Sequence, residues 1–237
     1  MNNNTGILYI IPTNLGCSDI NKISPPFNIK IINTLNEFIV EKIRTARRYF
    51  KSIGYTKSLD NIIFHTINKY TVHNELTGFL NSAINGKNIG LLSEAGCPCI
   101  ADPGADIVKI AQQKNIKVIP LTGPNSILLG LMASGFNGQN FAFSGYLPIN
   151  KEERTKKIKQ IEKKIYNNNQ TQIFIETPYR NVSLFEDILK TCENKTLLCI
   201  ATNITLKDES IITKPICEWK KSLPDIHKKA TVFLLYK

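Results

Sequence analysis

Short apolar runs alternate with amphipathic stretches along most of the chain, and this alternation restricts the fold more than any other feature. Runs of this length are typical of buried strands, and apolar residues at helical spacing are typical of helices. Strands separated by helices favour parallel sheets, so we predict an α/β fold. The predicted strands are 6–11, 88–93, 117–121, 141–144, 172–175, 197–201 and 231–236. The predicted helices are 43–53, 75–85, 105–114, 126–134, 151–165 and 181–190, and 29–40 holds a helix followed by a short strand.

The length of 237 residues is large for one compact domain and comfortable for two of about 100–150 residues each. We predict an N-terminal α/β domain at 1–121 and a C-terminal α/β domain at 122–237. No apolar run approaches the roughly 20 residues that span a bilayer, and the first residues lack the pattern of a secretion signal. We therefore expect a cytoplasmic protein that makes no membrane contact.

The chain is strongly basic, with 30 Lys and Arg against 19 Asp and Glu and a net charge of +11. Such an excess favours a polyanionic partner, nucleic acid first. The abundance of Lys, Asn and Ile is also the mix that an AT-rich genome imposes on any protein, so a compositional origin stays open. Two stretches, 42–51 and 151–164, concentrate the charge, either as solvated helix faces or as phosphate contacts. The candidates for substrate contact are Arg44, Arg47, Arg48, Lys151 and Arg154.

The six cysteines predict neither disulfides nor a metal site. Without a secretion signal, reduced thiols are expected. Cys97 and Cys99 are separated by one residue, and no second close pair or nearby histidine completes a zinc set. We therefore expect no metal.

Three loops rich in Gly and Pro follow three predicted strands, at Pro12–Gly16, Glu94–Gly104 and Thr122–Pro124. In α/β sheets, ligands bind beyond the carboxyl ends of strands, where Gly and Pro let a rigid main chain approach them. Small side chains and backbone groups there suit a neutral or zwitterionic nucleoside, although plain turns explain these residues equally well. The phosphate-binding motifs of nucleoside triphosphatases and dinucleotide enzymes are absent, as is the G-x-S-x-G motif of serine hydrolases.

The segment Leu92–Gly104, LSEAGCPCIADPG, closely resembles the SDAGTPLISDPG signature of the tetrapyrrole methylase superfamily, in its ribosomal RNA small subunit methyltransferase I branch. Further blocks of this family are matched in order along nearly the whole chain, at 6–16, 120–124, 133–135, 143–148 and 175–180. The resemblance implies two α/β domains with S-adenosylmethionine in the cleft between them, and usually a homodimer. In this branch, the substrate is RNA of the small ribosomal subunit, methylated on the 2′-hydroxyl of a ribose in the decoding region.

The resemblance also implies a set of cofactor contacts on the three loops and in the second domain. These are Pro12, Asn14, Glu94, Ala95, Gly96, Cys97, Pro98, Ile100, Ala101, Asp102, Thr122, Gly123, Pro124, Ser126, Glu176 and Thr177. A hydroxyl nucleophile must lose its proton. Glu94 and Asp102 are the candidate acceptors by position, although either could simply brace its loop.

Two family blocks are altered in this chain. The family's EDTR appears as Glu41-Lys42-Ile43-Arg44, and its ARELTK block appears at 201–207 without the Arg-Glu pair. These changes keep two alternatives open. One is methylation of a tetrapyrrole-like or other small metabolite, and the other is a non-catalytic module that binds S-adenosylmethionine.

Overall fold

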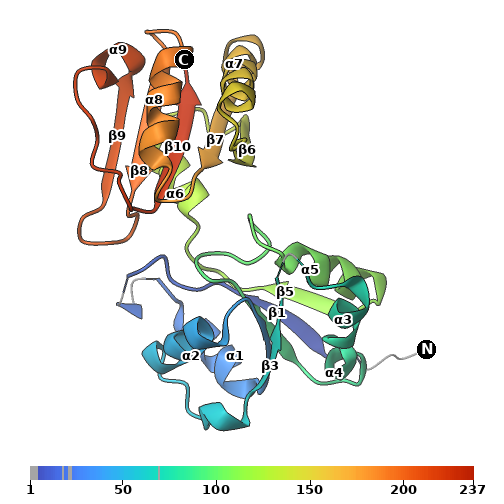
Figure 1. Cartoon of the computed structure of the whole chain (residues 1–237). Coiled ribbons are helices and arrows are strands. Elements are labelled where there is room, and N and C mark those ends of the chain that lie inside the picture. The colour runs from blue at the N-terminus through green and yellow to red at the C-terminus, as the bar shows by residue number, and fades with distance from the viewer. Residues whose placement is uncertain (1–4, 18, 21–22, 69) are drawn as a thin grey trace. The chain divides into compact units, whose positions relative to one another are not determined.

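The structure is a computed structural model that describes residues 5–17, 19–20, 23–68 and 70–237. The chain divides into two compact units, Met1–Asn125 and Ser126–Lys237, here called unit 1 and unit 2. The domain boundary predicted after Leu121 lies in the same connecting segment and stays a prediction. Each unit holds one five-stranded sheet with helices packed on it (Figure 1).

The sheet of unit 1 is parallel throughout, as the alternating pattern predicts. Its strands follow the order β3-β2-β4-β1-β5. They are β1 (Ile7–Ile11), β2 (Glu37–Val40), β3 (Ile63–Thr66), β4 (Ile89–Leu92) and β5 (Lys117–Pro120). The helical segments are α1 (Pro26–Thr34), α2 (Ile43–Ser52), η2 (Leu59–Asn61), α3 (His73–Gly78), α4 (Asn81–Ile84) and α5 (Gly104–Gln113).

Both faces of this sheet are covered, which explains why its strands are apolar along their length. Leu8 and Ile10 of β1 pack in a cluster with residues of α3, α4 and α5, whereas Tyr9 and Ile11 pack in a cluster with residues of α1 and α2. Successive side chains of a strand point to opposite faces, so the two clusters lie on the two sides of the sheet (Figure 1). Unit 1 is therefore a three-layer sandwich.

Unit 2 has a mixed sheet, which corrects the expectation of parallel strands throughout. The order is β6-β7-β10-β8-β9, and of its neighbouring pairs only β6 and β7 are parallel. The strands are β6 (Phe141–Tyr146), β7 (Thr171–Ile175), β8 (Leu197–Thr202), β9 (Ser210–Pro215) and β10 (Thr231–Tyr236). The helices are α6 (Ser126–Ser134), α7 (Lys151–Asn168), α8 (Asn181–Thr191) and α9 (Ile216–Trp219). No helix connects β8 to β9, so these strands pair as a hairpin rather than through a parallel crossover.

Most predicted elements are confirmed, with ends shifted by a few residues. The predicted helix 75–85 is instead two short helices, α3 and α4, and its interruption follows Gly78, a weak helix former. Strands β3 and β9 are absent from the prediction. Each lies at an edge of its sheet with several half-exposed or exposed residues, so neither carries a continuous apolar run.

Arg154 of α7 belongs to the interior of unit 2. Its side chain pairs with Asp187 of α8, with 2.6 Å between Nη2 and Oδ2, and its Nη1 donates to the carbonyl of Ile149 at 2.7 Å. Only 6% of Arg154 is exposed. The expectation that Arg154 contacts a substrate is therefore replaced by a structural role, because its donors are used inside the unit.

We expect Arg154→Ala to lower the free energy of unfolding of unit 2 by about 3–5 kcal/mol, because it leaves Asp187 buried without its partner. The measurement is urea denaturation followed by circular dichroism. The control is Lys151→Ala, an exposed position one turn earlier in α7, which should change the midpoint little. Equal midpoints for the two variants would show that the buried pair does not hold the unit together.

Candidate functional site

The three Gly- and Pro-rich loops leave the same edge of the sheet in unit 1. Strand β1 lies between β4 and β5 and is parallel to both. The carboxyl ends of all three strands therefore meet, and the segments that follow them lie side by side. This edge, formed by 12–16, 93–104 and 121–125, is called the loop edge below.

Hydrogen bonds join the first two loops directly. The backbone N–H of Thr13 donates to the carbonyl of Gly96 at 2.9 Å. The hydroxyl of Thr13 donates to the carbonyl of Ser93 at 3.3 Å, and the Ser93 hydroxyl donates to the same Gly96 carbonyl at 2.7 Å. The loops after β1 and β4 therefore form one connected structure.

The third loop is tied to the second through Cys97. Its thiol donates to the carbonyl of Pro124, with 3.5 Å between sulfur and oxygen. Burial raises the pKa of the Cys97 thiol, so the thiol keeps the proton that this contact uses. Cys97 stands where the SDAGTPLISDPG signature has a threonine, and its thiol makes the same kind of donor contact that a hydroxyl would make.

Two positions of the loop edge require glycine, each for a different reason. A Cβ on Gly123 would lie 2.3 Å from Cβ of Pro12, so no side chain fits there. Gly96 has a φ of +73°, which favours glycine. Cys99 and Ala101 have φ values of +70° and +63° without being glycine, and such strained residues cluster at functional sites.

Asp102 braces the second loop from within. Its Oδ1 accepts hydrogen bonds from the backbone N–H groups of Cys99 and Gly104, both at 2.8 Å. Burial raises the pKa of Asp102 although these two hydrogen bonds oppose the shift. The carboxylate therefore holds the strained Cys99–Gly104 turn and the start of α5 in place.

Glu94 is held by the β2–α2 turn, a contact that sequence reasoning missed. Its carboxylate accepts from the ammonium of Lys42 at 3.0 Å and from the hydroxyl of Thr45 at 3.3 Å. Its backbone N–H donates to Oε1 of Glu41 at 3.1 Å. The sequence signal for this contact is the altered EDTR block, because its Glu41 and Lys42 both form hydrogen bonds with Glu94.

Burial raises the pKa of Glu41, and the negative charges of Asp102 and Glu94 add to the effect. Glu94 and Asp102 thus both lie close enough to Glu41 to repel its carboxylate. These three carboxylates make the loop edge rich in hydrogen-bond acceptors. Such a site suits a ligand with positive charge and donor groups, and it disfavours a phosphate.

The remaining expected contacts fall in two groups. Unit 1 brings together on the loop edge Pro12, Asn14, Glu94, Ala95, Gly96, Cys97, Pro98, Ile100, Ala101, Asp102, Thr122, Gly123 and Pro124. Two carbonyls of this group are held from outside the loops, since Tyr49 donates to Pro12 at 3.2 Å and the side-chain amide of Asn28 donates to Thr122 at 2.7 Å. Ser126, Glu176 and Thr177 belong to unit 2, and their contribution to cofactor binding stays a prediction.

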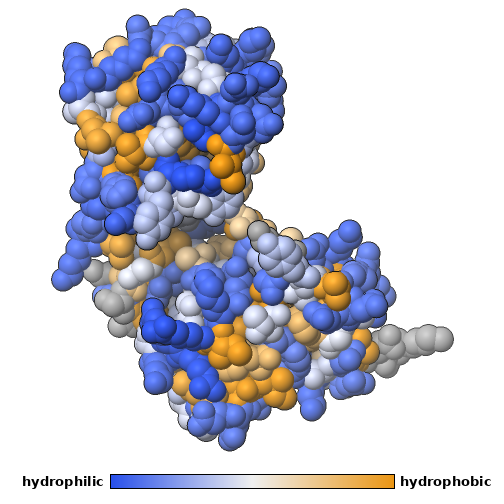
Figure 2. All heavy atoms as spheres, in the orientation of Figure 1, coloured by the Kyte–Doolittle hydropathy of each residue, from blue (hydrophilic) through white to orange (hydrophobic). Residues whose placement is uncertain are grey.

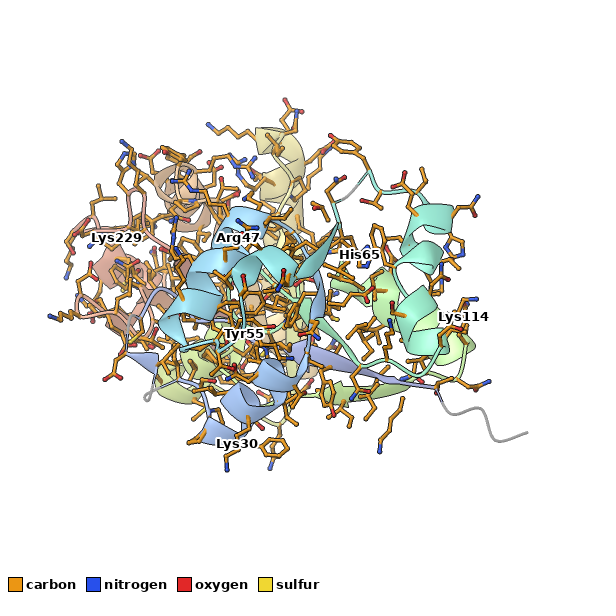
Figure 3. All side chains as sticks on the ribbon, turned by 90° about the horizontal axis from the view of Figure 1, so that it is seen from below. Lys30, Arg47, Tyr55, His65, Lys114 and Lys229 are labelled. Atoms are coloured by element: carbon orange, nitrogen blue, oxygen red, sulfur yellow. The ribbon has the colours of Figure 1, made fainter. Side chains whose placement is uncertain are left out.

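The predicted substrate contacts of unit 1 lie on the exposed side of α2. Arg44, Arg47 and Arg48 are all exposed, and Figure 2 shows strongly hydrophilic side chains over this helix. Arg47, labelled in Figure 3, lies 3.6 Å from Asp60 and 6.0 Å from the centre of the Phe64 ring. In unit 2, Lys151 is exposed at the start of α7.

Among the described residues, no group of three His, Cys, Asp or Glu side chains is arranged to hold a metal ion. All six cysteines are free thiols. Within the same part of the chain, no helix has both the length and the apolar character that a membrane crossing requires.

No protein-family model matches the chain. Two relatives named ribosomal RNA small subunit methyltransferase I are each 32% identical to it. The protein from Buchnera aphidicola subsp. Schizaphis graminum aligns over 237 residues, which is 98% of this chain and 79% of the relative. The protein from Bacillus subtilis aligns over 219 residues, which is 90% of this chain and 68% of the relative.

Solved structures of tetrapyrrole methylases share the fold at low sequence identity. The methyltransferase CobJ is similar with a TM-score of 0.66 at 14% identity, over 98% of this chain and 95% of its own. A uroporphyrin-III C-methyl transferase from Thermus thermophilus, solved in complex with S-adenosyl homocysteine, is similar with a TM-score of 0.58 at 11% identity, over 98% of each chain. These likenesses confirm the predicted fold class.

Three observations point to the same family: the motifs in the loops, the α/β architecture and the sequence identity over almost the whole chain. The chain belongs to the ribosomal RNA small subunit methyltransferase I family.

Proposed function

We propose that the protein uses S-adenosylmethionine to methylate the 2′-hydroxyl of a ribose in RNA of the small ribosomal subunit. The observation that carries this proposal is the loop edge, where three joined loops present acceptors in a chain of this methyltransferase family. The fold neighbour bound to S-adenosyl homocysteine supports the cofactor. We place the activity in the cytoplasm, where ribosomal subunits are assembled, and propose that the protein acts as a homodimer.

The loop edge fits the chemistry of S-adenosylmethionine. When bound, this cofactor supplies a methyl group on a positively charged sulfur. Glu41, Glu94 and Asp102 place negative charge at the edge, which favours a sulfonium cation and a free amino group over an anionic ligand. The loop backbones, which include Gly96 and Gly123, would line the nucleoside part.

Methyl transfer would form a carbon–oxygen bond to the ribose and break the carbon–sulfur bond, whose electron pair returns to the sulfur to leave neutral S-adenosylhomocysteine. The ribose hydroxyl would lose its proton. The chain's residues contribute by holding the hydroxyl in line with the methyl group and by accepting the proton. Asp102 and Glu94 stay the candidates for the acceptor. Burial makes the Asp102 carboxylate more basic than usual, whereas Lys42 neutralises part of the charge of Glu94.

The exposed side of α2 is the proposed contact for RNA phosphates in unit 1. Arg44, Arg47, Arg48 and Lys51 lie together around a surface hollow on this helix. The same helix contacts Glu94 through Thr45. Helix α2 therefore serves the loop edge on one side and the proposed RNA contact on the other.

The direct test is transfer of labelled methyl from S-adenosylmethionine to small ribosomal subunits from a strain that lacks this enzyme. We expect one labelled ribose. The double variant Arg44→Gln, Arg48→Gln should raise KM for the subunit with little change in cofactor affinity. Each lost phosphate contact also makes binding less dependent on salt. Absence of label in subunits from every assembly stage would contradict the proposal, and label in a small metabolite would favour the tetrapyrrole-like alternative.

Substitution of Gly96 tests the place of the cofactor. We expect Gly96→Ala to weaken binding of S-adenosyl homocysteine at least about ten-fold, because the new Cβ would lie 3.1 Å from Leu15 and crowd the loop edge. The measurement is isothermal titration calorimetry.

The matched control is Gly54→Ala. Gly54 has a similar φ of +68°, but a Cβ there meets nothing within 4 Å. Both variants carry the same cost of a left-handed alanine, about 1 kcal/mol, so only the loop contact differs. Equal cofactor affinities in the two variants would show that Gly96 does not line the site.

Cofactor affinity should depend on pH through Glu41. Ionised Glu41 favours a cationic ligand, so affinity should rise with pH as this group loses its proton. The pKa of Glu41 is raised. As the pH is lowered, cofactor affinity should therefore begin to fall at a higher pH than it would with a glutamate of ordinary pKa. Glu41→Gln keeps an acceptor for the backbone N–H of Glu94 but has no proton to gain or lose. In this variant, the decrease in cofactor affinity should therefore occur at a lower pH.

Calorimetry across the acidic range measures this effect, with Glu75→Gln as the control at an exposed position on α3. The neighbouring charged groups, Glu94, Asp102 and Lys42, are unchanged in both variants. An identical pH profile for Glu41→Gln and the wild type would remove Glu41 from the account.

A further inference from the structure

Unit 2 exposes an aromatic side chain beside a cation at the end of a strand. Tyr179 follows β7, and 74% of it is exposed. The ammonium of Lys228 lies 5.7 Å from the centre of its ring. Neither residue is among the contacts that the family resemblance implies.

The turn that carries Tyr179 is held firmly by buried groups. The buried carboxylate of Glu176 accepts from Nη2 and Nε of Arg180 at 2.6 and 3.0 Å, and from the backbone N–H of Thr177 at 2.6 Å. The backbone N–H of Lys228 donates to the carbonyl of Pro178 at 3.1 Å. The ring and the ammonium are therefore presented by two segments that are fixed to each other.

A second exposed tyrosine ends the neighbouring strand. Tyr146 of β6 aligns with Ile175 of β7, so both strands end at the same edge of the sheet. Its side chain is 54% exposed. Lys229 is paired with Asp225 and Asp208 at 2.8 and 3.2 Å, so its charge is offset, whereas Lys228 lies against the ring of Tyr179.

We propose that Tyr146, Tyr179 and Lys228 form a binding edge for an unpaired stretch of RNA. Tyr179 stacks on a base, and Lys228 contacts the adjoining phosphate. Exposed aromatic rings on fixed loops, with a cation beside them, are how proteins hold single-stranded nucleic acid, because every base has a face that stacks. This inference rests on the proposed RNA substrate and adds the part of the chain that selects unpaired nucleotides.

The experiment measures binding of the full chain to a short fluorescein-labelled single-stranded RNA of mixed sequence, by fluorescence anisotropy. We expect Tyr179→Ala to weaken binding by about five- to a hundred-fold, the range for loss of one stacked base. Tyr179→Phe keeps the ring and should bind as the wild type does. Tyr70→Ala, at a 79% exposed tyrosine of unit 1, is the matched control and should also leave binding unchanged.

A second readout reports stacking itself. The chain has one tryptophan, Trp219, which is buried. Tyr179→Trp adds an exposed indole, whose fluorescence should be quenched by the single-stranded RNA and far less by a duplex of the same sequence. A structural role for Tyr179 would produce no such difference.

The outcomes separate this inference from the proposed function. If Tyr179→Ala binds RNA as the wild type does and still labels subunits, the binding edge is wrong and the proposed function stands. Loss of affinity for intact subunits without loss for single-stranded RNA also overturns the binding edge, because the edge would then contact a ribosomal protein. A wild type that neither binds RNA nor labels subunits overturns both proposals.

Discussion

The hydrogen bond from the backbone of Thr13 to the carbonyl of Gly96 is the contact on which the loop edge depends. It joins the segments after β1 and β4 at 2.9 Å, and the hydroxyls of Thr13 and Ser93 reinforce it. Glycine loses more conformational freedom than any other residue when a loop orders, whereas proline is already restricted and loses less. By satisfying their own polar groups against one another, the loops stay ordered beyond the buried ends of β1 and β4.

Charge is divided across helix α2 in a way that suits two different partners. On the side towards the loops, Lys42 and Thr45 hold Glu94, beside the raised-pKa carboxylates of Glu41 and Asp102. On its exposed side, the charged residues that line the hollow are all positive: Arg44, Arg47, Arg48 and Lys51. The two sides of this helix therefore suit the two proposed ligands, a cationic cofactor at the loop edge and an anionic RNA at the exposed arginines.

The sequence predicts the loop edge well because its signals are local. Pro12, Gly96 and Gly123 each lie just beyond an apolar run, and parallel pairing of the three strands brings them together. The contact between Glu41 and Glu94 is missed because the two residues are 53 positions apart and Glu41 accepts from the backbone N–H of Glu94 rather than from its side chain. Arg154 is misjudged for the same reason, since only the fold shows that Asp187, 33 residues later, faces it. The antiparallel pairing of β8 with β9 is likewise missed, because the partly exposed residues of β9 form no continuous apolar run.

The most direct measurement of the central claim is a crystal structure of the protein with S-adenosyl homocysteine. We expect density for the nucleoside against the loop edge, in contact with the segments that follow β1, β4 and β5. Density that touches none of these three segments would contradict it.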